Sequence, residues 1–456
     1  LAQVVVGRIL AIEPHPQADK LRIAKVDAGG KPLTIVCGGS NIAVGQWVPV
    51  ALIGARVRWH GEGEPIEVKP IEIRGVASEG MICAANEIGL AEAFPHGERE
   101  ILDLGLAIPG DAWTPGTPLA EALGLADDFL LDSEVTTNRP DMLGMVGFAR
   151  EVAAILGREF KEPQEKPIQA AQLPEISLRL EGERDGKPLC SRFCAVRIRG
   201  VHAATSPWWM KRRLVAAGVR PVNVLIDITN YVLLEWGQPM HAYDADRLQG
   251  GLRVAPGIPG ESFEALNGTT YVLDSSMPTV RDEVGPVALA GIIGGQRAAV
   301  DAATATVLFE AATFDEVSIR RTARALDVAT EAAKAFEKGL SSYGPLPALR
   351  RAVELCLALA GGDLSSGVAD IATPRKVEVF SLPEAQARSL MGLPMAGEEM
   401  QVLLERLGFS VQRQNGVLTA EVPWWRDHDI EDGRDLVEEI ARLHGYANMQ
   451  PVFPAG

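Results

Sequence analysis

Residues 1 to about 112 alternate between hydrophobic and polar positions with the period of two that is typical of β-strands. The positions that alternate in phase are Leu33, Ile35, Cys37, Val48, Val50, Leu52, Ile71 and Ile73. Gly29 and Gly30 fit a hairpin turn. Several short strands with glycine turns predict a small barrel or sandwich. Within it, Lys20, Arg22 and Lys25 are either candidate phosphate contacts or solvated strand residues.

A hydrophobic segment near the middle of the chain is followed by a turn and two polar side chains. Tyr231 to Trp236 is apolar except for Glu235, and periodicity does not separate a buried strand from a short helix here. The segment from Gly237 to Pro239 predicts a loop that presents His241 and Asp244 at the rim of the packed region. A histidine beside a carboxylate is a general base, a metal ligand or a hydrogen-bonded loop residue, and the residues alone leave these alternatives open.

A second hydrophobic segment, Val307 to Asp315, predicts a buried strand that contains Glu310. An unpaired buried carboxylate is costly, so a partner is expected, and a nearby arginine is the simplest choice. Ser318 to Leu326 then predicts an amphipathic helix with its arginines mostly away from its apolar side.

The pattern of the last part of the chain predicts a helix, a hairpin and a final helix. The first helix runs from Glu398 to Leu407 and ends at Gly408, and Asn415-Gly416 is a strong signal for a two-residue turn between strands. This order resembles a winged-helix-like domain, for which DNA binding is the less favoured interpretation.

Four carboxylates gather around the final helix. At about 100° per residue, Asp435, Glu438 and Glu439 share one arc of the helix, and Asp429 approaches from the preceding segment. Carboxylates without His or Cys suit a hard cation such as Mg²⁺. Acidic residues are also favoured near any helix N-terminus, so the spacing alone leaves both interpretations open.

Composition narrows the class of protein. The chain has 456 residues, so about three domains are expected. Its formal net charge is −16, so any RNA contact needs a local basic patch, shape recognition or a partner subunit. The five cysteines suit buried thiols in a reducing compartment, and Cys190, Cys194 and His202 have poor spacing for zinc. No apolar run is long enough for a membrane span, and no basic-then-apolar leader opens the sequence.

Four motifs, in order along the chain, resemble the beta subunit of bacterial phenylalanyl-tRNA synthetase. They are HPQADKLRIAKVD at residues 15–27, TNRPDMLGM at 137–145, GQPMHAYD at 237–244 and PWWRDHDIEDGRDLVEEIARLHGY at 423–446. The resemblance covers essentially every residue present. It implies a fragment that lacks the extreme N-terminus and the C-terminal catalytic-like and anticodon-binding domains of that family.

The resemblance also implies a multidomain α+β fold. Residues 1–112 would form an OB-fold β-barrel that binds tRNA, and 113–175 a helical connector and linker. Residues 176–370 would form the α+β editing domain, and 376–451 a winged-helix-like domain with a magnesium-associated acidic motif.

The resemblance assigns roles to particular residues of this sequence. His241 matches the histidine that positions or activates water, and Glu310 matches the carboxylate that reads a tyrosine hydroxyl. The pocket positions are Asn230, Gly294, Thr330 and Ala332, and the magnesium positions are Asp429, Asp435, Glu438 and Glu439. The family commonly has Ser, Arg and Arg where this chain has Ala333, Ala335 and Lys338, which puts a nearby helix surface and tRNA docking in question.

The implied function is part of a cytoplasmic phenylalanine–tRNA ligase, which charges tRNA(Phe) using ATP and has two alpha and two beta chains. This fragment would bind tRNA(Phe) and hydrolyse mischarged Tyr-tRNA(Phe), so tyrosine and phenylalanine are the ligands to be distinguished. Mg²⁺ would lie at the alpha-subunit interface, and ATP would be used by the whole enzyme and not bound by this fragment. Alternatives are an RNA-binding or assembly scaffold with an inactive pocket, and a stand-alone aminoacyl-tRNA deacylase.

Overall fold

The computed structural model describes residues 1–126, 128–169, 173–374 and 376–449. Residues 170–172 of the expected linker and 450–451 of the expected last module lie outside the described residues. The chain divides into two compact units. The first comprises Leu1–Asp132 with Ser206–Pro221, and the second comprises Ser133–Thr205 with Val222–Gly456.

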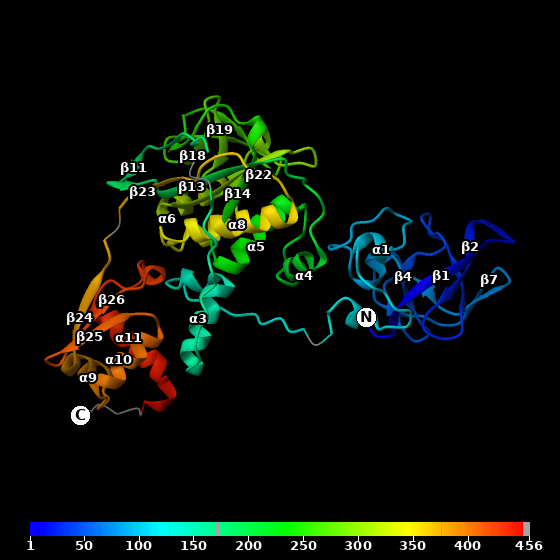
Figure 1. Cartoon of the computed structure of the whole chain (residues 1–456), viewed down its shortest axis with the longest axis horizontal. Coiled ribbons are helices and arrows are strands. Elements are labelled where there is room, and N and C mark those ends of the chain that lie inside the picture. The colour runs from blue at the N-terminus through cyan, green and yellow to red at the C-terminus, as the bar shows by residue number, and fades with distance from the viewer. Residues whose placement is uncertain (127, 170–172, 375, 450–456) are drawn as a thin grey trace. The chain divides into compact units, whose positions relative to one another are not determined.

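The first unit is built on a five-stranded antiparallel sheet with the order β3-β2-β1-β4-β9 (Figure 1). Its strands are β1 Val4–His15, β2 Ala18–Asp27, β3 Leu33–Cys37, β4 Trp47–Ala51 and β9 Met81–Ile82. Smaller elements of the unit are β5 Arg56–Val57, β6 Ile66–Glu67, β7 Ile71–Ile73, β8 Val76–Ser78, α1 Leu104–Ala107 and α2 Leu119–Ala122. The positions predicted to alternate do lie in strands, except Leu52, which comes one residue after β4, and Ile35, Val48 and Val50 are fully buried.

The barrel expected for this unit is not closed by strand pairing among the described residues. The edge strand β3 lies beside the end of β8 but forms no strand ladder with it: the N–H of Glu79 donates to the Thr34 carbonyl at 2.8 Å. The Glu79 carboxylate and the Ser78 hydroxyl accept from the N–H groups of Thr34 and Val36, at 2.8 and 3.1 Å. One backbone hydrogen bond and two side-chain hydrogen bonds therefore cover this edge in place of a strand ladder, so the sheet is open where the sequence predicted closure.

A helix from much later in the sequence completes the first unit. In α4, Trp208–Ala216, the Trp208 ring stacks on Phe94 with centroids 5.0 Å apart, and its indole N–H donates to the Leu123 carbonyl at 2.8 Å. The buried Lys211 ammonium donates to the Ala93 carbonyl at 3.2 Å. The basic side of α4 is therefore partly used for packing within the first unit.

The centre of the second unit is two packed sheets with helices on one side. The first sheet has the order β14-β21-β13-β22, with β23 also paired to β13, and the second has the order β10-β15-β18-β19-β20. In the first sheet the strands are β13 Cys190–Arg199, β14 Met240–Asp244, β21 Thr306–Phe314, β22 Asp363–Leu364 and β23 Ala369–Ala372. In the second they are β10 Leu178–Leu180, β15 Leu252–Pro256, β18 Pro278–Arg281, β19 Pro286–Leu289 and β20 Ile293–Gly294. The β10–β15 pair is parallel and its neighbours are antiparallel, so this sheet is mixed.

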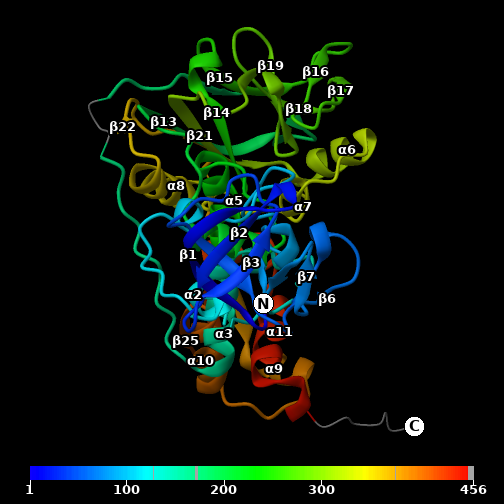
Figure 2. The same ribbon diagram turned by 90° about the vertical axis from the view of Figure 1, so that its right-hand side faces the viewer.

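The core of this part lies between the two sheets. Tyr243 and Leu308 of the first sheet pack there with Val254, Val280 and Leu289 of the second. Helices α5 Val224–Trp236 and α8 Pro345–Leu359 pack on the first sheet, and both views place them opposite the second sheet (Figures 1 and 2). Smaller elements are β11 Glu183–Arg184, β12 Lys187–Pro188, β16 Ser262–Glu264, β17 Thr270–Val272, α6 Glu316–Leu326 and α7 Glu331–Phe336.

The ambiguous central segment is a helix, and the next element along the chain is a strand. Asn223 caps α5 through hydrogen bonds from two backbone N–H groups, and Gly237 ends it with a φ of 72°, which glycine adopts readily. Only Gln238 and Pro239 separate this cap from β14. The expectation that His241 and Asp244 lie on a loop rim is therefore wrong, because both belong to β14.

The last part of the second unit combines three helices with a three-stranded sheet. The helices are α9 Glu384–Met391, α10 Gly397–Arg406 and α11 Gly433–His444, and the strands are β24 Val379–Pro383, β25 Ser410–Gln414 and β26 Val417–Glu421. The sheet order is β24-β26-β25. The turn between β25 and β26 has positive φ at Asn415 and Gly416, which confirms the predicted hairpin.

Helix α3, Met145–Leu156, packs against this last part through Ala154. Pro140–Leu143 forms a short 3₁₀ turn, and extended backbone at Gly144 separates it from α3. Among the described residues, no helix combines the length and the apolar character that crossing a membrane requires.

Candidate functional site

The candidate site is built on two neighbouring strands of the second unit. In the antiparallel pair of β14 and β21, His241 lies directly opposite Glu310. Tyr243 is two residues beyond His241 and therefore shares its face of the sheet. This is the face that packs toward the second sheet, since Tyr243 belongs to the core between the sheets.

Glu310 is a buried acid whose partner is a phenol. The Tyr243 hydroxyl donates to Glu310 Oε2 at 2.5 Å, and the Glu310 side chain is almost fully buried. Burial raises the pKa of Glu310 from 4.5 to about 7, although the hydrogen bond from Tyr243 acts to lower it. No ion pair to an arginine involves Glu310 in the described part of the chain, so the arginine partner expected from sequence is replaced by Tyr243.

His241 is a half-buried histidine that is neutral at physiological pH. Desolvation lowers its pKa from 6.5 to about 4. The ring meets the Tyr243 ring edge-on, with centroids 4.5 Å apart and planes at 71°. A neutral imidazole keeps one nitrogen lone pair, so His241 is able to accept a proton from water.

The second sheet approaches His241 through a glycine. A Cβ atom added at Gly294 of β20 would lie 2.3 Å from His241 Cε1 and 2.6 Å from its Nε2. Any larger residue at position 294 would displace the imidazole. The requirement is steric, and it explains why a glycine stands at this pocket position.

The other predicted pocket residues fall into two groups. Thr330 caps α7 by accepting from the Ala333 N–H, and its hydroxyl donates to the Ile292 carbonyl at 2.8 Å, two residues before Gly294. Ala332 packs against the same core. Asn230 comes from α5, which covers the opposite face of the first sheet, so it lies apart from the face that carries Glu310 (Figure 2).

The positions where the chain departs from the resembled family are mostly internal. Ala333 and Ala335 are buried members of the core between the sheets, and Lys338 is half-buried. The expectation that these three residues alter a helix surface is wrong for the two alanines, because their side chains pack inward.

The acidic motif of the final helix is organised by an arginine, Arg426. The Arg426 guanidinium donates to Asp429 Oδ2 and to Glu439 Oε2, both at 2.7 Å. All three side chains are almost fully buried. Burial raises the pKa of Asp429 despite Arg426, whereas for Glu439 hydrogen bonds from Arg426 and Arg442 outweigh the opposing effect of burial and lower the pKa to about 2.

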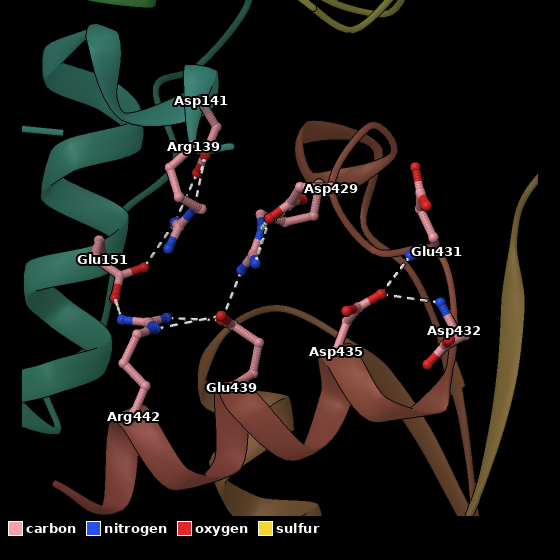
Figure 3. A network of polar contacts seen from close by, with 10 residues as sticks. Arg139, Asp141, Glu151, Asp429, Glu431, Asp432, Asp435, Glu439 and Arg442 are labelled. Carbon is pink, nitrogen blue, oxygen red and sulfur yellow. Dashed lines mark hydrogen bonds and ion pairs between the residues drawn. The ribbon is translucent and has the colours of Figure 1, made fainter. Parts of the chain in front are cut away.

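The same network continues into α3 and the turn before it. Arg442 of α11 binds both Glu439 and Glu151, and Arg139 donates to Glu151 at 2.8 Å and to Asp141 at 2.9 Å (Figure 3). Positive and negative side chains thus alternate from Asp141 to Asp429. The helical arc of acids did not indicate the three arginines, although the Arg426–Asp429 and Glu439–Arg442 spacings of three residues are a detectable signal.

The remaining two predicted metal ligands have separate surroundings. Asp435 accepts from the backbone N–H groups of Glu431 and Asp432, at 2.8 and 3.0 Å, as part of a helix capping box, and Glu438 is exposed. No cluster of three or more His, Cys, Asp or Glu side chains suited to a metal occurs among the residues described. The four carboxylates therefore do not fit one Mg²⁺ site, since a guanidinium stands between the two that do approach each other.

The three predicted phosphate contacts lie on exposed positions of β2. Arg22 and Lys25 both pair with β3 in regular register, so their odd spacing places them on opposite faces of the sheet. The Lys25 ammonium donates to the Thr34 hydroxyl at 2.6 Å. A phosphate chain running along one face would meet Arg22 or Lys25 but not both.

Three family models match successive parts of the chain. They are a putative tRNA binding domain at residues 4–109, a B3/4 domain at 189–361 and a tRNA synthetase B5 domain at 380–446. Together with the two-unit α+β architecture, they define a multidomain chain of the aminoacyl-tRNA synthetase class.

Curated relatives identify the family within that class. The phenylalanine–tRNA ligase beta subunit of Moorella thermoacetica is 41% identical over 455 residues, which cover 99% of this chain and 55% of the relative. That of Anaeromyxobacter dehalogenans is 38% identical over 463 residues, covering 100% of this chain and 55% of the relative. The chain belongs to the phenylalanine–tRNA ligase beta subunit family, and it spans about half the length of these relatives.

A solved structure is also similar. It is an N-terminal fragment of the phenylalanyl-tRNA synthetase beta subunit from Pyrococcus horikoshii, at 18% identity and a TM-score of 0.37, with 69% of this chain and 86% of that chain covered.

Proposed function

We propose that this chain carries the hydrolytic editing site of a cytoplasmic phenylalanine–tRNA ligase and removes tyrosine from mischarged tRNA(Phe). The observation that carries the proposal is the pairing of a neutral His241 with the buried acceptor Glu310 across β14 and β21. The family membership supplies the substrate class, namely an aminoacyl ester of tRNA(Phe).

Discrimination rests on a single hydroxyl. Tyrosine and phenylalanine differ only there, and an apolar synthetic site cannot strongly reject an added hydroxyl. A buried acceptor such as Glu310 selects for that hydroxyl instead, because phenylalanine would leave the acceptor desolvated and unpaired. Glu310 is thereby assigned the recognition of tyrosine.

Hydrolysis is assigned to a positioned water and His241. The water oxygen attacks the ester carbonyl carbon, and His241 takes the proton that the water loses. The bond from that carbon to the ribose oxygen then breaks, and the ribose oxygen receives the proton. The products are free tyrosine and tRNA(Phe) with its terminal ribose hydroxyl restored.

The remaining parts of the proposal concern the whole enzyme. An OB-fold module at residues 1–112 would contact tRNA(Phe), through Lys20 and Arg22 on one face of β2 or through Lys25 on the other. A winged-helix-like module at 376–451 would meet the alpha subunit in an assembly of two alpha and two beta chains. The segments 113–175 and 176–370 would be the connector and the editing domain. ATP and Mg²⁺ serve the proposed synthetic reaction of the whole enzyme, and no step proposed for this chain uses either.

The test compares release of tyrosine and phenylalanine from tRNA(Phe) by this chain, by His241→Ala and Glu310→Gln variants, and by a Glu264→Gln control at an exposed position of β16. The proposal expects selective release of tyrosine by the wild type and the control. It expects slow release by the His241 variant and loss of selectivity in the Glu310 variant.

Two alternatives are separated by the same assay repeated with the alpha subunit. A scaffold with an inactive pocket releases neither amino acid in either format. A stand-alone deacylase works equally well with and without the alpha subunit, whereas an editing module of the ligase gains activity when the complete enzyme docks the tRNA.

A further inference from the structure

Tyr243 touches both members of the proposed catalytic pair. Its hydroxyl donates to Glu310 Oε2 at 2.5 Å, and its ring makes a T-shaped contact with the His241 imidazole at a centroid distance of 4.5 Å. Its side chain is fully excluded from solvent, so no water competes for the phenol. The hydrolytic mechanism proposed for His241 and Glu310 makes no use of it.

The two oxygens of the Glu310 carboxylate have different surroundings. A carboxylate accepts hydrogen bonds through both oxygens, and Tyr243 holds Oε2. Holding one oxygen fixes the orientation of the group and leaves Oε1 as the acceptor for a further hydroxyl. A tyrosine substrate therefore meets an acceptor that is already oriented and need not displace the resident phenol.

The groups that face Glu310 make Tyr243 the dominant polar influence on it. From β14 these groups are Tyr243 and the neutral His241, and from β13 the group is the Cys190 thiol, whose pKa burial raises well above its ordinary value. Burial raises the pKa of Glu310, and within the described residues Tyr243 is the hydrogen-bonding partner that lowers it. Without this phenol the buried carboxyl would hold its proton more tightly and would lose acceptor strength at neutral pH.

We infer that Tyr243 is a positioning residue of the editing site, which holds Glu310 as an oriented acceptor and so sets the preference for tyrosine over phenylalanine. The inference rests on the proposed editing function. It assigns to Tyr243 no contact with the substrate, because its hydroxyl is already bound to Glu310.

The test is Tyr243→Phe, which removes only the hydroxyl. Its matched control is Tyr271→Phe on β17, where the hydroxyl accepts from the Asn267 amide outside the site. Release of tyrosine and phenylalanine from tRNA(Phe) is measured from pH 6 to pH 9 for both variants, the wild type and Glu310→Gln. The kcat/KM for tyrosine release by Tyr243→Phe should fall about tenfold at pH 7, as expected for loss of one hydrogen bond to a charged group.

The pH profile separates positioning from mere packing. In Tyr243→Phe the selectivity for tyrosine should recover as the pH rises and Glu310 ionises, whereas a packing defect lowers both activities equally at every pH. Equal selectivity of Tyr243→Phe and the wild type throughout this pH range would overturn the inference. An equal loss of tyrosine release and phenylalanine release at every pH would also overturn it.

A titration that needs no activity separates this inference from the proposed function. The protonated carboxyl of Glu310 is followed by its infrared C=O band, assigned by its disappearance in Glu310→Gln. Its pKa should rise in Tyr243→Phe, and an unchanged pKa contradicts the role of Tyr243. If the wild type releases no tyrosine in the complete enzyme, the proposed function fails, and the titration still decides whether Tyr243 controls Glu310.

Discussion

At the scale of single residues, the site holds an acid and a base whose pKa values are shifted in opposite directions by the same desolvation. Burial raises the pKa of Glu310 to about 7 and lowers that of His241 to about 4. At neutral pH the histidine is therefore uncharged, and the carboxyl is close to its midpoint. The pair carries little net charge in the space between the sheets.

These shifts predict a pH dependence of stability. Glu310 favours folding below pH 4.5, and this contribution is lost as the pH rises through about 7. His241 favours folding above pH 6.5, and this contribution is lost as the pH falls through about 4. The two contributions oppose each other in the wild type. In Glu310→Gln only the pH-dependent contribution of His241 should remain.

The expected result for Glu310→Gln is a free energy of unfolding that decreases, relative to the wild type, by roughly 3 kcal/mol between pH 7 and pH 4. Urea unfolding at a series of pH values measures it, with Glu264→Gln as the exposed control. If the free energy of unfolding depended on pH in the same way in Glu310→Gln and the wild type, the pKa values of Glu310 and His241 would not be shifted in these opposite directions.

The sequence predicted the members of this site better than their surroundings. The motif around His241 and the hydrophobic context of Glu310 single out both residues. Periodicity could not show that β14 and β21 pair in a register that sets them opposite, nor that Tyr243 replaces an arginine as the partner of Glu310. Pairing between distant strands is set by tertiary packing, which local patterns do not encode.

At the scale of elements, α11 and α3 are joined by buried ion pairs that the sequence suggested as a metal site. The arc of carboxylates on α11 was predicted correctly as helical, but Arg426 stands before the helix and reaches Glu439 thirteen residues later. Contacts of that range depend on how the segment before α11 turns. Spacing along one helix therefore identified the acids and missed the cation.

Arg426→Gln should be strongly destabilising, because it leaves Asp429 and Glu439 buried without their shared partner. Breaking a buried pair costs about 3–5 kcal/mol. The matched control is Arg434→Gln, whose partner Asp432 is on the surface, so this variant should lose far less stability than Arg426→Gln. Urea unfolding of both variants measures the difference, and equal losses would contradict the buried network.

The same cluster predicts indifference to magnesium. A guanidinium already lies between Asp429 and Glu439, so excess Mg²⁺ or its removal with a chelator should leave the thermal midpoint of this chain unchanged. Differential scanning calorimetry tests this directly. A midpoint that rises with Mg²⁺ in the wild type, and no longer does so in Glu438→Gln or Asp435→Asn, would restore the metal assignment.

At the scale of the whole molecule, the multidomain α+β class was predictable, whereas the division into units was not. Strand patterns dominate the start of the sequence, and helix and strand patterns are mixed after it. These patterns did not indicate that residues 206–221 belong to the first unit, because a helix with tryptophans and basic residues fits many environments.

This division predicts the outcome of a cut between Asp132 and Ser133. The N-terminal piece should stay bound to the remainder under native conditions, because α4 packs on it through Trp208 and Lys211. Size-exclusion chromatography of a chain with a protease site at this position measures retention. Trp208→Ala should release the piece, whereas Trp59→Ala, at an exposed position, should not.

The placement of α4 also limits how this protein can be recombined. A graft that exchanges residues 1–132 for those of a distant relative would leave a foreign module facing the original Trp208 and Lys211. The donor must therefore supply two segments, the module and its matching helix, for the chimera to fold. A functional exchange of the N-terminal module therefore requires two segments to be replaced together. The junctions of a chimera that folds should lie at the end of the module and on either side of residues 206–221.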